Sequence, residues 1–165
     1  MGTSGPMAHK AVSRFTVPIR NQVLNTWPSH NINMDMEITL RACAQDIWDA
    51  LGPGYSESVY HAAFETHLRA RGISYETERI VPVYYMGQNV GHVRADIIVN
   101  RKYVIELKSV GKLNDVYRIQ TQNYLKLLEL ETGFLINFPD KRVPLEFEVL
   151  APHTPPDPPM HIIDC

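Results

Sequence analysis

The stretch "HVRADIIVNRKYVIELKS", residues 92–109, contains two apolar runs that flank the polar triplet 100–102. Two runs rich in β-branched residues, joined by a short polar segment, predict an antiparallel β-hairpin. Side chains alternate between the two faces of a strand, so the odd-numbered residues from Val93 to Leu107 are expected to form the main core. The other face carries four charged residues: Arg94, Asp96, Glu106 and Lys108.

A hairpin whose loop is residues 100–102 pairs residues whose numbers add up to 202. Asp96 then faces Glu106 at roughly 5 Å, and Arg94 faces Lys108. Facing carboxylates repel each other unless a positive charge lies between them. One solution is a divalent cation such as Mg²⁺, which prefers carboxylate oxygens. The other is a pair of crossed ion pairs, Asp96 with Lys108 and Glu106 with Arg94.

The hairpin belongs to a longer series of helical and extended patterns. Helices are predicted within residues 34–54, 56–72 and 115–133. The third has Val116, Ile119, Leu127 and Leu130 near one apolar stripe. Strands are predicted within residues 73–86, 90–100, 102–110, 133–138 and 144–150. This order predicts an α+β, sandwich-like fold in which helices cover a central sheet.

Three segments differ in composition. Residues 1–34 lack sustained periodicity and are interpreted as an N-terminal extended tail, and residues 151–165 as a proline-rich C-terminal tail. Residues 35–150 are expected to form one domain, consistent with a chain of 165 residues of which 44% are apolar and 21% charged. We expect a protein partner, or a second copy of the chain, to engage the tails.

Charge and cysteine content limit the possible classes of protein. The net charge of −2 argues against binding of nucleic acid by bulk electrostatics, yet the segment from Arg94 to Lys126 holds seven basic and three acidic residues. Two distant cysteines predict free thiols in a reducing compartment, and no secretory signal or membrane span is seen. We therefore expect an intracellular protein, cytoplasmic or nuclear.

Two helices add polar residues that are suited to a site. Glu57 and Tyr60 are spaced i, i+3, and Gln120 and Tyr124 are spaced i, i+4, so each pair lies on one helix face. A simpler interpretation is that Glu57 complements the helix dipole and that the Gln-Tyr pair borders the core. His61, one turn after Glu57, is interpreted as a packed or exposed histidine and not as a metal ligand.

Taken in order, these residues resemble the GxxExxY family, a branch of the PD-(D/E)XK nuclease superfamily. The naming pattern is present as Gly54-Tyr55-Ser56-Glu57-Ser58-Val59-Tyr60. "ADIIV", "VIELKSV", "IQTQNYL" and "GFLINF" follow in the family's order, and the resemblance covers about residues 37–138. It implies a PD-(D/E)XK, restriction-endonuclease-like core: a mixed sheet flanked by helices, with a hairpin that bears the metal ligands.

The resemblance also implies an activity, the metal-dependent hydrolysis of phosphodiester bonds in nucleic acid, with DNA as the expected substrate. Asp96 and Glu106 would hold Mg²⁺ or Mn²⁺, and Glu57 would orient water or bind a second ion. Lys108 would position or activate the attacking water and stabilise developing charge. The supporting residues would be Tyr60, Gln120 and Tyr124.

Three cations of the basic segment, Arg94, Lys112 and Arg118, are candidates for holding flanking phosphates. Two alternatives to an enzyme remain open at this stage. One is a catalytically silent nuclease fold that serves as a structural or interaction component of an assembly such as a DNA-virus particle. The other is a module that binds nucleic acid without cutting it.

Overall fold

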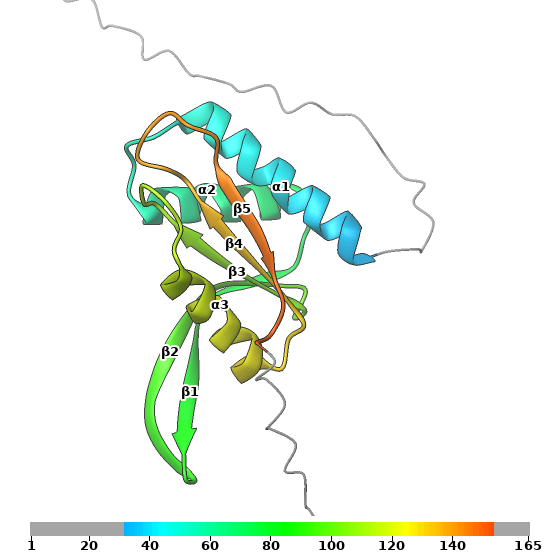
Figure 1. Cartoon of the computed structure of the whole chain (residues 1–165). Helices are drawn as coiled ribbons and strands as arrows, with labels where there is room; N and C mark the ends of the chain where they lie inside the picture. Colours follow the sequence, from blue (N-terminus) through cyan, green and yellow to red (C-terminus); the bar gives the residue numbers. More distant parts are fainter. Residues whose placement is uncertain (1–31, 154–165) are drawn as a thin grey trace, which may run out of the picture. The chain divides into compact units, whose positions relative to one another are not determined.

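The computed structural model describes residues 32–153 (Figure 1). The chain divides into two units, Met1–His30 and Asn31–Cys165, and only the second contains described residues. The first helix begins at Ile32, before the domain boundary expected from the sequence. The remainder of the expected N-terminal tail, and residues 154–165 of the C-terminal one, lie outside the described part, as does any partner contact that those segments make.

A five-stranded mixed sheet forms the centre of the domain, with the strand order β1-β2-β3-β4-β5 (Figure 1). The strands are β1 (Tyr75–Tyr85), β2 (Gln88–Val99), β3 (Tyr103–Lys108), β4 (Thr132–Asn137) and β5 (Glu146–Leu150). Only β3 and β4 pair in parallel; the other three neighbouring pairs are antiparallel. The parallel pair requires a crossover, and α3 (Asp115–Leu128) supplies it. The predicted α+β architecture is therefore confirmed.

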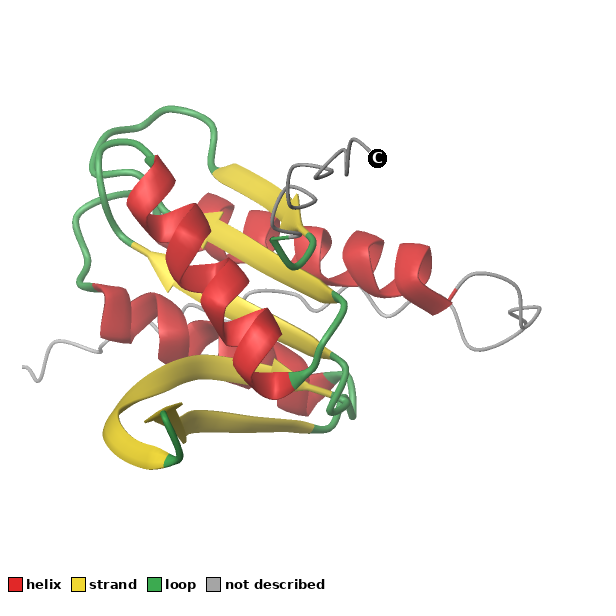
Figure 2. Cartoon of the chain, turned by 60° about the horizontal axis from the view of Figure 1, so that its bottom comes forward, coloured by secondary structure: helices red, strands yellow, loops and turns green. Residues whose placement is uncertain are grey.

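Helices cover the sheet with two separate apolar clusters. The larger cluster joins α1 (Ile32–Leu51) and α2 (Glu57–Ala70) to the sheet through side chains such as Trp48 and Phe64. The smaller one joins α3 to β2 and β3 through Tyr124 and Leu125. Figure 2 shows α3 in front of the strands and the other helices behind them. A charged strand residue that points toward α3 is thus covered by a helix and kept from bulk water.

The register of the central hairpin agrees with the prediction. Ile97 pairs with Ile105, and Val99 with Tyr103. Asn100 and Arg101 turn the chain with φ values of 51° and 57°, and the Lys102 amide donates to the Val99 carbonyl at 3.0 Å. The pairing between β2 and β3 ends at Ile97, so the two strands separate from Asp96 toward the start of β2.

The prediction of one continuous odd-numbered core face is wrong beyond this point. Val93 and Ala95 pack in the smaller cluster beside α3, and not with Ile97 against α1 and α2. Opposite Asp96, Glu78 has a left-handed φ of 52° and falls between the paired residues of β1 and β2. A left-handed residue turns a strand, and so the faces change there.

The predicted stripe of α3 is also wrong for most of its members. Val116, Ile119 and Leu127 are exposed, while the helix buries Thr121, Tyr124 and Leu125. The buried face is partly polar because its hydroxyls have partners: Thr121 donates to the Tyr117 carbonyl at 3.0 Å. Burial thus followed satisfied hydrogen bonds rather than hydrophobicity alone.

Tyr60 fixes the loop that precedes α2. Its ring stacks on Phe138 with centroids 4.4 Å apart, and its buried hydroxyl donates to the Gly52 carbonyl at 2.6 Å. Gly52 has a left-handed φ of 65°, which permits the sharp end of α1. The loop therefore enters α2 in one conformation, with Glu57 at the first helical position.

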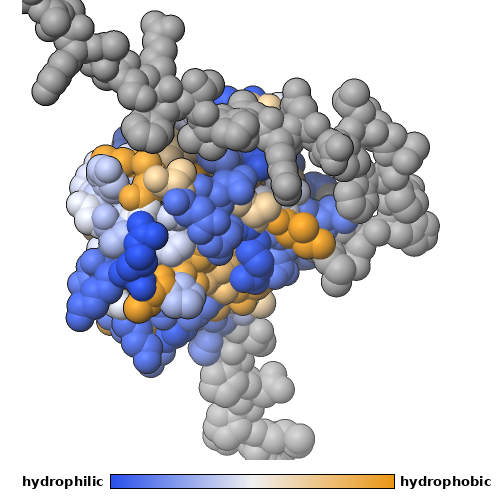
Figure 3. All heavy atoms as spheres, turned by 90° about the horizontal axis from the view of Figure 1, so that it is seen from above, coloured by the Kyte–Doolittle hydropathy of each residue, from blue (hydrophilic) through white to orange (hydrophobic). Residues whose placement is uncertain are grey.

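No helix among residues 32–153 is long and apolar enough to cross a membrane. Seen from above Figure 1, the described surface is largely hydrophilic, with apolar side chains in separate patches (Figure 3).

Replacing Tyr60 by Phe tests the loop anchor. The stacked ring remains, but the Gly52 carbonyl loses its buried donor, so we expect a loss of about 1–3 kcal/mol in the free energy of unfolding. Denaturant titration measures it. Tyr55→Phe, at an exposed tyrosine nearby, is the control; equal stability of both variants would contradict the role of the Tyr60 hydroxyl.

Candidate active site

The carboxylates of Asp96 and Glu106 approach each other where β2 and β3 separate. Asp96 Oδ2 accepts a hydrogen bond from the backbone amide of Leu107 at 2.9 Å. This bond replaces the backbone pairing that ends at Ile97, and it holds the Asp96 carboxylate beside β3. The two acids therefore lie near each other just beyond the paired part of the hairpin, and their predicted common site stays a prediction.

Glu106 forms a buried ion pair with Lys108, two residues along the same strand. Lys108 Nζ lies 2.6 Å from Glu106 Oε1, and the Glu106 side chain is only 1% exposed. Arg94 instead approaches Glu78, at 3.6 Å. Neither of the crossed pairs considered from the sequence is formed; the pairing of β2 with β3 ends at Ile97, before the residues that would make them.

The second oxygen of Glu106 has no hydrogen-bond partner, although it is buried. Burial, and the nearby Asp96 charge, raise the pKa of Glu106 to about 8, against the opposing effect of Lys108. An unpartnered buried carboxylate oxygen is costly, and a cation on that oxygen would remove the cost. The donor set is therefore suited to a hard divalent ion.

Two carboxylates are sufficient for such an ion. Mg²⁺ commonly takes one or two carboxylates and completes its shell with water and phosphate oxygens. Within the described part of the chain, no three His, Cys, Asp or Glu side chains gather closely enough to hold a metal by themselves. Glu57 thus does not form a third preassembled ligand here, and its predicted metal role stays a prediction.

Lys108 remains a cation at this site. Burial acts to lower its pKa, but the carboxylates of Glu106, Asp96 and Glu57 outweigh burial, and the pKa is raised. Its Nζ also lies 5.5 Å from the centre of the Tyr117 ring on α3. A lysine held in this way supplies positive charge and donors rather than a base.

Glu57 reaches the same electrostatic environment from α2. Partial desolvation raises the pKa of this surface carboxyl, with Lys108 opposing and Asp96 adding to the rise. The Ser109 hydroxyl, which follows Lys108, donates to the Tyr55 carbonyl at 3.0 Å and ties the two loops together. The helix-borne acid thus lies in the same electrostatic environment as the hairpin acids, and its predicted role in the site stays a prediction.

Gln120 and Tyr124 support the site from α3. Gln120 Nε2 donates to the Tyr124 hydroxyl at 3.0 Å, and that hydroxyl donates to the Arg94 carbonyl at 2.7 Å. Arg94 is two residues before Asp96. These two hydrogen bonds therefore hold the backbone of β2 close to the position where it carries the Asp96 carboxylate.

His61, interpreted from the sequence as a packed or exposed histidine, lies half-buried beside Asp96, a neighbour that the sequence interpretation did not give it. Its Nε2 lies 3.3 Å from the Asp96 carbonyl oxygen, and its Nδ1 lies 3.1 Å from Glu65 Oε1. The signal was available, because Glu57, His61 and Glu65 are spaced four residues apart on one helix face. Only the tertiary structure shows that the Asp96 carbonyl lies beside His61.

Asn137 is a second residue that was not predicted. It is fully buried in an apolar strand, accepts from the Val110 amide at 3.0 Å and donates to the Val110 carbonyl at 3.0 Å and to Glu146 at 2.7 Å. These bonds hold the loop that follows Lys108. An amide inside the otherwise apolar run 133–138 was the available signal.

The three candidate phosphate-binding cations differ in availability. Arg94 and Lys112 are exposed. Arg118 is held by Glu148 through two contacts of 2.7 and 2.8 Å and by Asp115 at 2.8 Å. A phosphate would have to compete with those carboxylates, so Arg94 and Lys112 are the better placed of the three.

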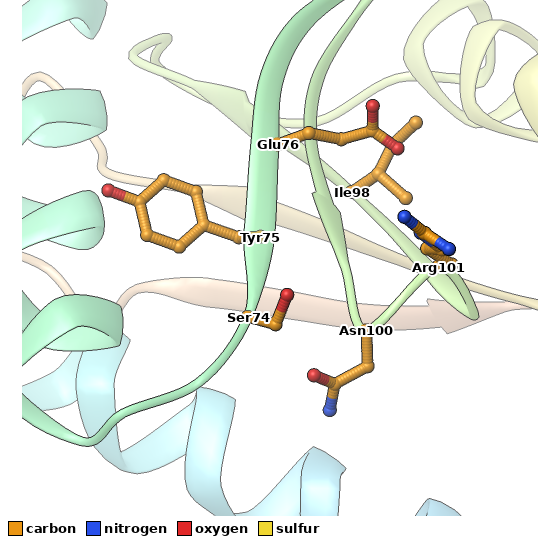
Figure 4. A pocket seen from close by; sticks show the side chains of 6 residues that line it. All are labelled: Ser74, Tyr75, Glu76, Ile98, Asn100 and Arg101. Atoms are coloured by element: carbon orange, nitrogen blue, oxygen red, sulfur yellow. The ribbon is translucent and has the colours of Figure 1, made fainter.

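A separate hollow lies beside the turn between β2 and β3. It is lined by Ser74, Tyr75, Glu76, Ile98, Asn100 and Arg101 (Figure 4). Glu76 and Arg101 point to the Ile98 side of the strands, whereas Tyr75 points to the other. It adjoins the N-terminal end of β3, while Glu106 and Lys108 lie in the C-terminal half, so it is not part of the candidate site.

The chain belongs to the PD-(D/E)XK nuclease superfamily, whose model matches residues 34–148. Among solved structures, the crystal structure of SSO0001 has a similar fold, with a TM-score of 0.50 and 15% identity over 73% of this chain and 78% of that one. An alkaline exonuclease from Laribacter hongkongensis gives a TM-score of 0.40 and 16% identity over 71% and 82% of the two chains. No curated protein matches significantly.

The raised pKa of Glu106 predicts a pH-dependent response to metal. Between the ordinary carboxyl pKa and about 8, the folded state binds more protons than the unfolded state, so metal-free stability falls as pH rises. A ligand must be deprotonated, so apparent Mg²⁺ affinity should be roughly 100-fold weaker at pH 6 than at pH 8.5. The rise in melting temperature on adding Mg²⁺ should therefore be larger at pH 8.5.

The control is the same measurement on Glu106→Gln, which cannot ionise and should show no pH-dependent gain. Comparing each protein with and without Mg²⁺ cancels any effect of the substitution on folding. Equal gains at both pH values in the wild type would contradict the assignment.

Proposed function

We propose that the protein is a nuclease that uses Mg²⁺ or Mn²⁺ to hydrolyse phosphodiester bonds of nucleic acid, with DNA as the expected substrate. The observation that carries the proposal is the buried Glu106 carboxylate, with one oxygen on Lys108 and the other without a partner, next to Asp96. Membership of a nuclease superfamily supports the same reading.

We further infer that the chain belongs to the GxxExxY branch. The pattern from Gly54 to Tyr60 has a physical role here that supports this inference. Tyr60 fixes the loop before α2 through Gly52, and Glu57 thereby faces Lys108 and Asp96. The acid and the tyrosine of the pattern thus contribute to one site.

Asp96 and Glu106 would hold the cation. When bound, it would act as a Lewis acid on the scissile phosphate and favour ionisation of water. Lys108, which stays protonated beside Glu106, stabilises the negative charge that develops on the phosphoryl oxygens. The Leu107 amide and the Tyr124 bond keep Asp96 in place, so the carboxylate needs little reorganisation during the reaction.

Cleavage assays test the proposal directly. The wild type with Mg²⁺ or Mn²⁺ should degrade DNA, and EDTA should stop it. Asp96→Asn and Lys108→Met should each lower the rate by roughly 100-fold or more, since each removes charge stabilisation at the transition state. Lys141→Met, at an exposed lysine of the β4–β5 loop, is the matched control and should leave the rate unchanged.

Two outcomes separate this proposal from the non-cleaving alternatives. If the wild type and Asp96→Asn are equally inert on DNA and RNA and calorimetry detects no metal binding, the nuclease proposal is wrong. Salt-dependent binding without cutting would then identify a nucleic-acid-binding module, and no binding would leave a structural or interaction component.

A further inference from the structure

The outer part of the β1–β2 hairpin, residues 80–93, forms an arm. Its strands pair with each other from Ile80↔Arg94 to Tyr85↔Gln88, whereas the pairing of β2 with β3 ends at Ile97. Figure 1 shows the hairpin leaving the other strands, and Figure 2 shows it curling away from them. The arm is therefore a two-stranded ribbon.

The arm combines exposed apolar side chains with an absence of charge. No Asp, Glu, Lys or Arg occurs in residues 80–93. The exposed large apolar residues are Ile80, Tyr84, Tyr85, Met86 and Val90. Large apolar side chains gathered on a projecting element indicate a surface that contacts a partner.

At the turn that ends the arm, the apolar residue Met86 has a left-handed backbone conformation that is unfavourable for its residue type. Met86 and Gly87 have φ values of 49° and 77°, and Met86 is 85% exposed. Asn, Asp and Gly are preferred at both positions of such a turn, and a left-handed conformation costs other residues about 1–2 kcal/mol. The exposed Met86 side chain brings no folding benefit that would offset this cost, which favours a role in contact with a partner.

The dimensions and polar groups of the arm fit duplex DNA. A major groove about 12 Å wide admits a two-stranded β-ribbon. Gln88 and Asn89 beside the turn, and His92 farther along β2, add exposed polar groups to the arm, although Asn89 Oδ1 already accepts from the Gly91 amide at 2.9 Å. Amide side chains are suited to base edges. The arm has no cation, so its contacts to DNA would come from amide, hydroxyl and apolar side chains, groups that can reach base edges in the groove.

The arm is also continuous with the candidate site, because β2 carries both. From Asp96 to Gln88 the strand spans eight residues, at most about 26 Å at 3.3 Å per residue. That distance equals about 8 base pairs of B-DNA at 3.4 Å each. We propose that the arm reads bases in the major groove of a DNA substrate, within about 8 base pairs of the bond that is cut. This inference rests on the proposed nuclease function.

The test compares cleavage of a randomised duplex library by the full-length wild type, Gln88→Ala and Tyr84→Ala. The wild type should favour particular bases within about 8 base pairs of the cut. Each arm variant should relax that preference and weaken binding by about 5- to 100-fold, the range for one base contact. Gln45→Ala, at an exposed glutamine on α1, is the matched control and should match the wild type.

Salt dependence separates the arm from the phosphate-binding residues. Gln88→Ala should leave the slope of log affinity against log salt unchanged, because no cation is removed. Lys112→Ala should reduce the slope by about 1 and weaken binding equally on all sequences. A reduced slope in Gln88→Ala would overturn the assignment of the arm to bases.

Failure of this inference differs from failure of the proposed function. If the wild type cuts DNA without base preference, or the arm variants keep the wild-type preference, the inference is overturned and the nuclease function stands. If the arm variants instead change the sedimentation coefficient and not DNA binding, the arm is a protein interface, and the inference is again overturned. A wild type that cuts neither DNA nor RNA, whether or not it binds them, would instead remove the proposed function itself.

Discussion

The buried carboxylate of Glu106 is the constraint on which the site depends. Its strand, β3, lies in the middle of the sheet, between β2 and the parallel β4, and α3 covers the face toward which Glu106 points. A buried carboxylate there needs a positive charge or hydrogen-bond donors to offset the cost of desolvation. Lys108 supplies them to one oxygen only. Burial by the fold thus creates a site in which the Lys108 ammonium neutralises one oxygen of Glu106. The other oxygen could bind a second cation.

The structure around this pair holds the other groups at fixed places. Asp96 bonds to the backbone of β3, Tyr124 bonds to the backbone of β2 just before Asp96, and His61 approaches the Asp96 carbonyl from α2. Each bond comes from a different element. The position of Asp96 therefore depends on the packing of both helices against the sheet, which links stability of the fold to geometry of the site.

The left-handed residue Glu78 marks the point where the β1–β2 hairpin changes from strands of the central sheet to a projecting ribbon. On the inner side of Glu78, β1 and β2 belong to the central sheet. On its outer side, the strands turn toward α3 and, past Arg79 and Arg94, continue as an uncharged ribbon. Because one strand carries both Asp96 and the arm, a substrate that touches the arm would be placed relative to the site by a rigid element.

The sequence by itself determined the register of the hairpin beside its turn, since the period of two and the length of the turn fix which residues face each other; Asp96 and Glu106 lie just beyond that paired part. It also determined the order of the elements and the superfamily pattern. The tertiary structure alone decided which stripe of α3 is buried and into which apolar cluster Val93 and Ala95 pack. It also decided that Lys108 pairs with Glu106. The physical reason is that periodicity is a local property of the chain. The burial of a face and the partner of a charge depend on elements distant in sequence, such as α3 packing on β3 or α2 reaching Asp96.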